Sequence, residues 1–175
     1  MMYLDASSAN KIIRKQLKAH WPDVKFSVRK NNSSTTIQWT DGPTQSAVQE
    51  VTAWAEGITF DPMTDMGLLN EPVSAIKNAP DMVVADELAK LSGGLDEKIT
   101  ILNSFIHVKR DYSDEVKRET ADLIEKRWNV TIKRDENGTA THDFDERCRS
   151  IGAGAQSWSE VVRRQLAQTN LVASS

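Results

Sequence analysis

Residues 39–44 (WTDGPT) constrain the fold more than any other stretch of the sequence. Before them, apolar and polar residues alternate in two short runs, at 24–28 and 37–39, which is typical of half-buried strands, and the segment 31–34 between the runs has the composition of a turn. After them, apolar residues recur at spacings of three and four as far as Ile58. The stretch therefore predicts the end of a β-hairpin and, through its glycine and proline, the entry to an amphipathic helix.

The rest of the chain predicts further helices and short strands around this centre. The expected fold is α/β of the α+β type: a two-layer sandwich of a small, mostly antiparallel sheet with helices, in the order α-β-β-α-(α)-β-α-β-β-α. We expect one domain at residues 1–128 and a C-terminal hairpin-and-helix extension at 129–175. The expected helices lie at about 7–21, 44–58, 81–92, 113–128 and from 157 or 159 onward, the strands at 24–28, 37–39, 99–108, 130–132 and 139–142, an irregular turn at 58–66 and a loop at 67–80.

Composition and cysteine content favour a protein that stays in the cytoplasm. The 175 residues are 39% hydrophobic and 27% charged, as in soluble globular proteins, and no run approaches the roughly 20 apolar residues that span a bilayer. The N-terminus lacks the basic and apolar regions of a signal peptide. The single cysteine, Cys148, fits a reducing compartment, and between Arg147 and Arg149 we expect it to be an exposed bystander thiol. We expect no membrane partner.

Charge is distributed unevenly along the chain. The net charge is −3, but residues 61–97 contain eight acidic residues and only two lysines. Such a segment repels a phosphate backbone and attracts a basic protein surface, although a solvated loop and helix face would have the same composition. Basic residues on the first helix and the hairpin are candidates for contact with nucleic acid, or they simply form the solvent-exposed face of the helix. These residues are Lys11, Arg14, Lys15, Lys18, Arg29 and Lys30.

Sequence motifs of enzymes are missing from the chain. It has no glycine-rich nucleotide motif, no CxxC, no HExxH and no GxSxG. The candidates for acid/base or metal chemistry are Asp61 and Asp65, four residues apart, together with His107 and His142. Two carboxylates are too few for a hard cation, which takes six or more oxygen ligands. We therefore expect no catalytic residue, no cofactor and no metal site, and a metal-dependent enzyme is the least favoured alternative.

Five blocks of the sequence together resemble a known family. They are 12–17 (IIRKQL), 24–29 (VKFSVR), 37–44 (IQWTDGPT), 60–65 (FDPMTD) and 105–113 (FIHVKRDYS). In this order and spacing they resemble one of the large polyvalent protein-associated domains, the one numbered twenty-nine, over about residues 9–128. The resemblance implies a protein of a phage, conjugative plasmid or other mobile element, often found beside anti-restriction modules, and it implies no catalytic residues.

We therefore expect a protein that acts by binding. The hypothesis is counter-defence, of the anti-CRISPR or anti-restriction type, by protein–protein contact with a host defence complex. Nucleic-acid binding through the six basic residues is the alternative, and a homodimer is left open. The expected protein-binding residues lie in the acidic segment and on the C-terminal helix. They are Asp81, Asp86, Glu87, Trp158, Arg163 and Arg164.

Overall fold

The computed structural model describes residues 2–61, 63, 66–93, 97–151 and 154–171, and all structural statements below concern these residues. Their contacts divide the chain into two compact units. The first unit comprises Met1–Trp39 and Gln45–Lys109, and the second comprises Thr40–Thr44 and Arg110–Ser175. The division by contacts therefore falls at residue 110, before the helix that the sequence assigned to the N-terminal domain.

The first unit begins with a short strand and an amphipathic helix, β1 (Met2–Leu4) and α1 (Ala6–His20). Asp5 caps the helix, because its Oδ1 accepts a hydrogen bond from the Ser8 N–H at 3.0 Å. The helix therefore begins one residue before the predicted start at about residue 7. The apolar face predicted from the periodicity is buried, and it carries Ile12, Ile13 and Leu17.

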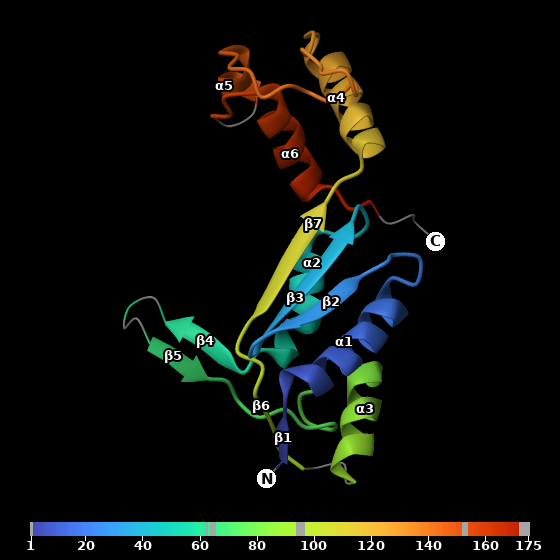
Figure 1. The fold of residues 1–175 in the computed structure, drawn as a ribbon, viewed down its shortest axis with the longest axis vertical. Helices are drawn as coiled ribbons and strands as arrows, with labels where there is room; N and C mark the ends of the chain where they lie inside the picture. Colours follow the sequence, from blue (N-terminus) through green and yellow to red (C-terminus); the bar gives the residue numbers. More distant parts are fainter. Residues whose placement is uncertain (1, 62, 64–65, 94–96, 152–153, 172–175) are drawn as a thin grey trace. The chain divides into compact units, whose positions relative to one another are not determined.

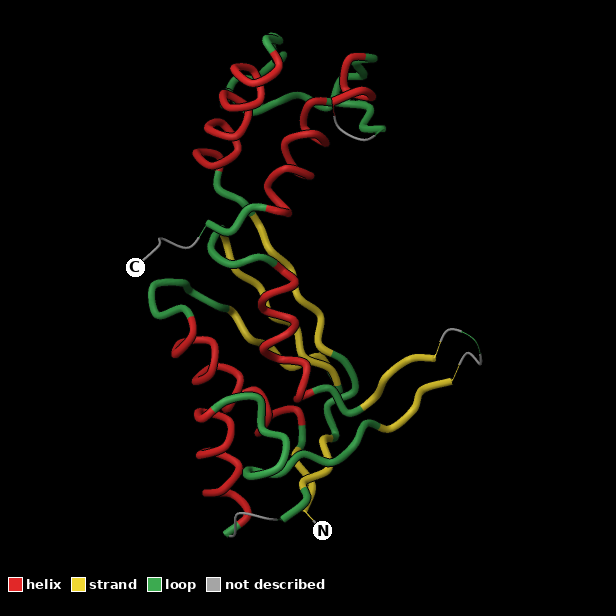
Figure 2. Tube along the Cα trace, turned by 180° about the vertical axis from the view of Figure 1, so that it is seen from behind, coloured by secondary structure: helices red, strands yellow, loops and turns green. Residues whose placement is uncertain are grey.

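A three-stranded sheet in the order β2-β3-β7 follows the alternating pattern of the sequence. β2 (Ser27–Asn31) and β3 (Ser34–Thr40) form the predicted antiparallel hairpin, and β7 (Ile106–Asp111) joins it. Figure 2 shows α2 (Gln45–Thr52) lying against this sheet, and the helix continues into the 3₁₀ turn η1 (Ala53–Ala55). The helix predicted to reach Ile58 is too long, because the extended dihedrals of Glu56 end it.

The remaining elements of the first unit complete its core. β1 pairs in parallel with β6 (Ile99–Ile101), so the single strand predicted at 99–108 is two strands, β6 and β7. α3 (Met82–Ser92) packs on α1 and begins, as predicted, at Asp81. One core joins these elements to the sheet, and its largest fully buried side chains include Ile13, Leu17, Ile37, Val48, Val84, Leu88 and Ile99.

A second hairpin occupies the segment predicted to be irregular. β4 (Ile58–Asp61) and β5 (Met66–Leu69) are antiparallel, and Figure 1 shows them extending away from the other elements of the first unit. The prediction of an irregular turn at 58–66 is wrong, because much of this segment lies in the two strands, and Phe60 of β4 is half exposed.

The second unit is mainly helical, with α4 (Asp114–Trp128), α5 (Arg147–Ile151) and α6 (Trp158–Gln168). Ser113 and Ser157 are the N-caps of α4 and α6. The last helix, whose start the sequence left open between 157 and 159, is therefore capped at Ser157. No regular strand occurs at 130–132 or 139–142 in the described residues, so the strands predicted there are too long. A short hairpin is present instead: Arg134 and Ala140 form an antiparallel bridge, the Asp135 N–H donates to Thr139 O and the Thr141 N–H donates to Lys133 O, both at 2.9 Å. A separate core of Ala121, Ile124, Ile132, Cys148, Trp158, Val161, Val162 and Leu166 holds this unit together.

These elements confirm the α+β class with small, mostly antiparallel sheets. None of the helices in the described ranges has the length and apolar content needed to cross a bilayer.

Candidate binding surfaces

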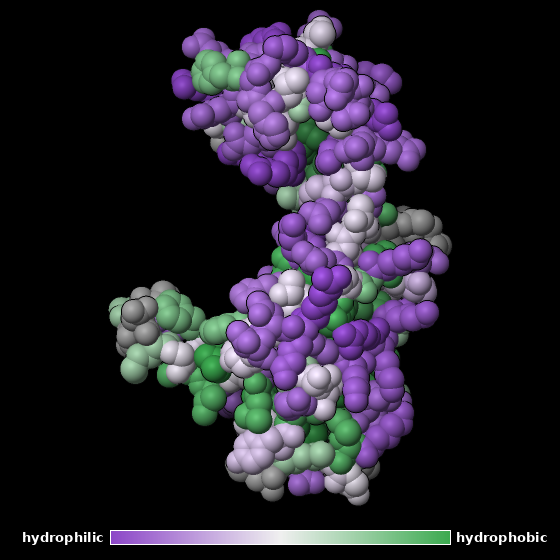
Figure 3. All heavy atoms as spheres, viewed as in Figure 1, coloured by the Kyte–Doolittle hydropathy of each residue, from purple (hydrophilic) through white to green (hydrophobic). Residues whose placement is uncertain are grey.

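The hairpin β4–β5 exposes more large apolar side chains than its length would lead one to expect. Phe60 and Leu68 are half exposed, and Met63 is 93% and Leu69 78% exposed. Met66, opposite Asp61 in the hairpin register, is also exposed. In Figure 3 these hydrophobic residues colour the hairpin, and apolar colour continues on the neighbouring surface of the first unit. Contiguous exposed apolar surface of this kind marks interaction sites in soluble proteins.

The hairpin also has open strand edges. Within the described residues its sheet contains only β4 and β5, so neither strand pairs with a third strand. A lone two-stranded hairpin is marginally stable in water, and an open edge is a template for pairing with another chain. Contacts at the base fix the hairpin to the first unit: the Gly57 N–H donates to Asn103 O at 2.7 Å, and the Asn70 N–H donates to Gly57 O at 2.9 Å. The exposed strands thus extend from a fixed base.

The surroundings of the hairpin are acidic. No lysine or arginine occurs between Lys30 and Lys77, a stretch that includes both strands. Asp61 ends β4, and Glu71 is exposed just after β5. This surface therefore combines apolar side chains with negative charge, which suits a partner whose apolar segment is flanked by basic residues.

Asp81, predicted to contact a partner, is engaged inside the first unit. Its Oδ1 accepts the Val84 N–H at 2.9 Å, and its Oδ2 accepts Gln16 Nε2 at 2.6 Å and lies 3.0 Å from His20 Nε2. Partial burial acts to raise the pKa of the Asp81 carboxyl, but these hydrogen bonds outweigh it and hold the pKa below its ordinary value. Asp81 therefore caps α3 and ties it to α1, which corrects its assignment to a contact surface.

The predicted acidic surface and the predicted basic stripe partly neutralise each other. Glu87 forms an ion pair with Lys15 across α1 and α3, with 2.5 Å between Nζ and Oε2, and a second one with Lys90 at 2.8 Å. These contacts lower the pKa of the Glu87 carboxyl. Arg14 is exposed as a residue, but its Nη2 donates to Val28 O at 2.5 Å. Asp86 of the acidic group is exposed, as are Lys11, Lys18, Arg29 and Lys30 of the basic group.

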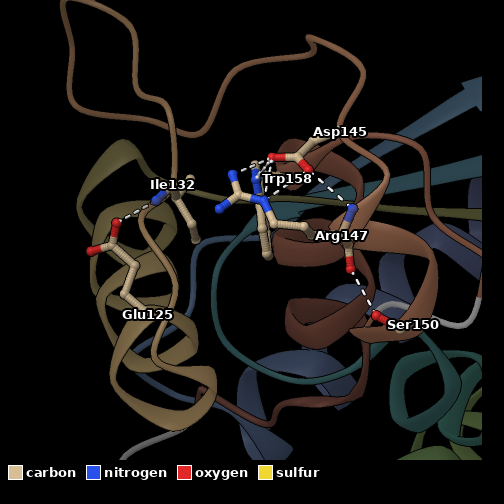
Figure 4. A network of polar contacts seen from close by, with 6 residues as sticks. All are labelled: Glu125, Ile132, Asp145, Arg147, Ser150 and Trp158. Atoms are coloured by element: carbon tan, nitrogen blue, oxygen red, sulfur yellow. Dashed lines mark hydrogen bonds and ion pairs between the residues drawn. The ribbon is translucent and has the colours of Figure 1, made fainter.

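Trp158, also predicted to contact a partner, is a core residue of the second unit. It is 1% exposed, and its Nε1 donates to Asp145 Oδ2 at 2.8 Å. Arg147 holds the same carboxylate, with Nη2 2.5 Å from Oδ2 (Figure 4). The amphipathic pattern of α6 buries the indole, so its assignment to a contact surface is corrected. Arg163 and Arg164 are exposed on the same helix, and Arg164 forms an ion pair with Glu160.

Cys148 is buried rather than exposed, which overturns the expectation of a surface thiol. Its side chain is 0% exposed among the residues of α5 and α6. Burial raises the pKa of the thiol, and nearby Arg147 lowers it by less. The flanking arginines therefore do not activate this cysteine.

The candidates for acid/base or metal chemistry are not assembled into a site. Asp61 Oδ1 accepts the Met63 N–H at 2.9 Å, His107 is exposed on β7, and His142 lies in the other unit. Asp65 lies outside the described residues. In the described part of the chain, no group of three or more His, Cys, Asp or Glu side chains is placed to hold a metal ion.

Arg110 holds the 39–44 stretch, and sequence reasoning did not single it out. It is 6% exposed, and its guanidinium donates to the carbonyl oxygens of Asp41 at 3.1 Å and Gly42 at 2.6 Å. The same group donates to Leu166 O and Thr169 O at the end of α6. Burial lowers the pKa of Arg110, and Tyr112, 4.9 Å away across its ring, opposes that shift. The sequence offered only a weak signal, because Arg110 stands between Lys109 and Asp111 at the polar end of the strand.

The described residues thus define a small α+β protein with exposed apolar and charged surfaces. The chain belongs to the family of the large polyvalent protein associated domain 29, whose family model matches residues 4–113. The predicted family is confirmed, but the match begins earlier than residue 9 and ends before α4. No curated protein and no solved structure matches the chain significantly. The family occurs in large polyvalent proteins of phage type, which fits a protein of a mobile element.

Proposed function

We propose that this mobile-element protein acts by binding a host protein, in counter-defence against a restriction or CRISPR complex. The family supports the mobile-element setting. The observation that carries the binding part is the hairpin β4–β5, which combines two open strand edges with large apolar side chains that are 51–93% exposed. Burial of such side chains drives most protein association, at about 25 cal/mol for each Å² of apolar surface removed from water.

The mode of binding is strand addition. An extended segment of the partner pairs its backbone with the open edge of β4 or β5, and its alternate side chains cover the apolar residues of the hairpin. Basic residues of the partner beside that segment complement the negative charges of Asp61 and Glu71. Asp86, Arg163 and Arg164 are the sequence-predicted contact residues whose side chains are exposed, and they remain candidates for secondary contacts.

The test is capture of a host complex by purified tagged protein, with and without nuclease, using a hairpin variant. The variant carries Phe60→Lys and Leu69→Lys, which lie on the same face of the hairpin because Leu69 is opposite Ile58 and Phe60 is two residues further along the strand. Both changes place charge among the exposed apolar side chains and oppose pairing at the edge. Its matched control carries Met82→Lys and Leu123→Lys, two exposed apolar residues elsewhere that give the same change in net charge. We expect a nuclease-resistant partner to bind the wild type and the control but not the hairpin variant.

Equal capture by the hairpin variant and the control would remove the hairpin as the contact surface. The counter-defence part has its own readout, which is the efficiency of plasmid transfer into a host with an active restriction or CRISPR system. Wild-type protein should raise that efficiency more in the host with the system than in the same host without it. The hairpin variant should raise it in neither host. A rise of the same size in both hosts would contradict counter-defence.

Nucleic-acid binding is the second candidate function, because Lys11, Lys18, Arg29 and Lys30 keep exposed side chains on neighbouring elements, α1 and β2. Binding through these residues would weaken steeply with salt, since each neutralised phosphate releases counterions. Retention on DNA at low salt that is lost when Lys11 and Lys18 become Gln would favour this function. Nuclease-sensitive capture of partners would favour it too.

A further inference from the structure

The second unit contains a cavity apart from the surfaces described above. Its volume is about 200 Å³, and residues of α4, α6 and the segment between them line it. Its floor is apolar and buried, because it is made of Ala140, Val162 and Leu166. A cavity of this size holds a small group together with part of an organic body.

Two cationic side chains and one imidazole line the cavity. They belong to Lys117, Arg163 and His142, and no carboxylate is among the lining residues of this cavity. Lys117 also forms an ion pair with Asp114, with 2.9 Å between Nζ and Oδ1. Within the described part of the chain, Arg163 makes no hydrogen bond and no ion pair, because Glu160, the acidic residue near it, reaches Arg164 instead at 2.5 Å. Arg163 is therefore available to a ligand.

Hydroxyl groups complete the lining. Tyr112, Thr139 and Ser159 line the cavity, and Ser159 Oγ lies 2.8 Å from His142 Nδ1. The same Ser159 Oγ lies 3.0 Å from Ser157 Oγ. These contacts hold the imidazole beside Arg163. A neighbouring hollow of about 180 Å³ is also lined by His142, Ser159 and Arg163, so these three side chains lie where the two spaces meet. Ser157 and Glu160 complete the lining of that hollow, and the Glu160 carboxylate is held by Arg164.

The donor set suits a phosphate group better than a carboxylate. A phosphomonoester presents three terminal oxygens and up to two negative charges, whereas a carboxylate presents two oxygens and one charge. Thr139 Oγ1 donates its proton to Asp135 Oδ2 at 2.6 Å. The donors of Lys117, Arg163, Ser159 and the His142 imidazole still exceed what one carboxylate can accept. Arg, in particular, matches phosphate oxygens through paired N–H groups.

We propose that this cavity binds a phosphomonoester, with its phosphate against His142, Ser159 and Arg163 and its organic body on the floor of Ala140, Val162 and Leu166. The ligand is a small phosphorylated metabolite or the terminal phosphate of a nucleic-acid strand, because both present the same group. All residues of the site belong to the second unit, and all of them except Tyr112 lie outside the residues 4–113 that the family model matches. The site does not depend on the hairpin β4–β5.

Titration calorimetry of the full chain tests the ligand class with three probes: inorganic phosphate, phenyl phosphate and benzoate. We expect phenyl phosphate to bind with a Kd at least about 10-fold lower than inorganic phosphate, because its ring removes the apolar floor from water. Benzoate should bind at least about 10-fold more weakly than phenyl phosphate. Equal binding of benzoate, or no heat from any probe at about 10 mM, would overturn the proposal.

Two neighbouring arginines provide the matched variants. Arg163→Gln removes a lining side chain, and Arg164→Gln makes the same change in net charge one residue away, at an arginine that does not line the cavity. Both are exposed, so both variants should keep the wild-type melting temperature. We expect Arg163→Gln to raise the Kd for phenyl phosphate about 10-fold and Arg164→Gln to raise it less than about 2-fold. Equal weakening would mean unspecific attraction of anions and would contradict the site. His142→Gln gives a second, independent variant with the same expectation as Arg163→Gln.

A pair of oligonucleotides separates the two sources of the ligand. If the same single-stranded sequence binds with a 5′-phosphate and not with a 5′-hydroxyl, and Arg163→Gln abolishes the difference, the site accepts a strand end. If phenyl phosphate binds and neither oligonucleotide does, the ligand is a small molecule. The proposal would be overturned if the two oligonucleotides bound equally and phenyl phosphate did not bind. That result would mean that the protein attracts the phosphate backbone of the strand and not its terminal phosphate.

Discussion

Arg110 Nη2 donates a hydrogen bond to the carbonyl oxygen of Gly42 at 2.6 Å, which joins the strand end at 110 to the turn that follows Trp39. Both Asp41, with φ of 57°, and Gly42, with φ of 68°, are in the left-handed region. That conformation turns the two carbonyl oxygens toward one buried guanidinium, and the Leu171 N–H also donates to Gly42 O at 2.9 Å. The carbonyl oxygens of this turn thus accept hydrogen bonds from Arg110 and from Leu171, which follows α6.

Replacing Arg110 with Lys is expected to loosen the end of α6. A lysine ammonium has three N–H donors on a single nitrogen, whereas the guanidinium spreads five N–H donors over three nitrogens. Lysine therefore cannot donate to all four carbonyl oxygens that Arg110 contacts. Loss of these charged hydrogen bonds should cost about 3 kcal/mol. Hydrogen exchange of the Leu171 amide measures the effect, since that amide bonds to Gly42, and its protection should fall about 100-fold. The exposed Arg164→Lys is the control, and equal protection in both variants would refute the role given to Arg110.

Gly57→Ala is expected to damage the first unit far more than Gly93→Ala does. A Cβ on Gly57 would lie 2.1 Å from Ile101 O, a backbone atom of β6 that cannot move aside without shifting the strand. A Cβ on Gly93 meets nothing within 4 Å, so only its φ of 63° is unfavourable. We expect losses of about 3 kcal/mol or more and about 1 kcal/mol, respectively. Melting temperatures measure both, and a similar fall in the two variants would contradict the close approach of Gly57 to β6.

Cys148 is expected to react slowly with a thiol reagent in the native protein. The side chain is 0% exposed and burial raises the pKa of the thiol, so reaction needs an opening of the second unit that also exposes the core around Trp158. The rate with a chromogenic disulfide should be at least about 100-fold below the rate in guanidinium chloride. Reaction at the unfolded rate under native conditions would show that α5 is not packed.

Local patterns in the sequence were sufficient for much of the fold. Alternation predicted β2 and β3, periodicity predicted α1 and α4, and Ser113 and Ser157 were recognisable as caps because capping depends on residues within one turn of helix. The family could also be recognised from short blocks in fixed order. In each case the information lies within a few positions along the chain.

The features that were missed depend on contacts between distant residues. Lys15 and Glu87, predicted to belong to opposite surfaces, are 72 positions apart and form an ion pair. Arg110 and Gly42 are 68 positions apart. The hairpin β4–β5 was missed for a different reason: apolar side chains normally indicate burial, and here they are exposed on strands with no covering layer. A single sequence carries no signal that separates such a hairpin from an irregular turn.

Acid should destabilise the second unit partly through Asp145. The pKa of this carboxyl lies far below its ordinary value of 3.8. Hydrogen bonds from Arg147 are the main cause, and the hydrogen bond from Trp158 adds to them, whereas burial acts in the opposite direction. Because the folded pKa is lowered, the carboxylate stabilises the fold fully above the unfolded value, and this contribution is lost as pH falls below about 4 toward the folded pKa. Asp145→Asn should therefore be less stable than the wild type at pH 7, and the difference should shrink between about pH 4 and pH 2. The urea midpoint of the Trp158 indole N–H resonance measures it, with the exposed Glu146→Gln as control. A difference that stays constant over this range would mean that Asp145 acts through packing rather than through its charge.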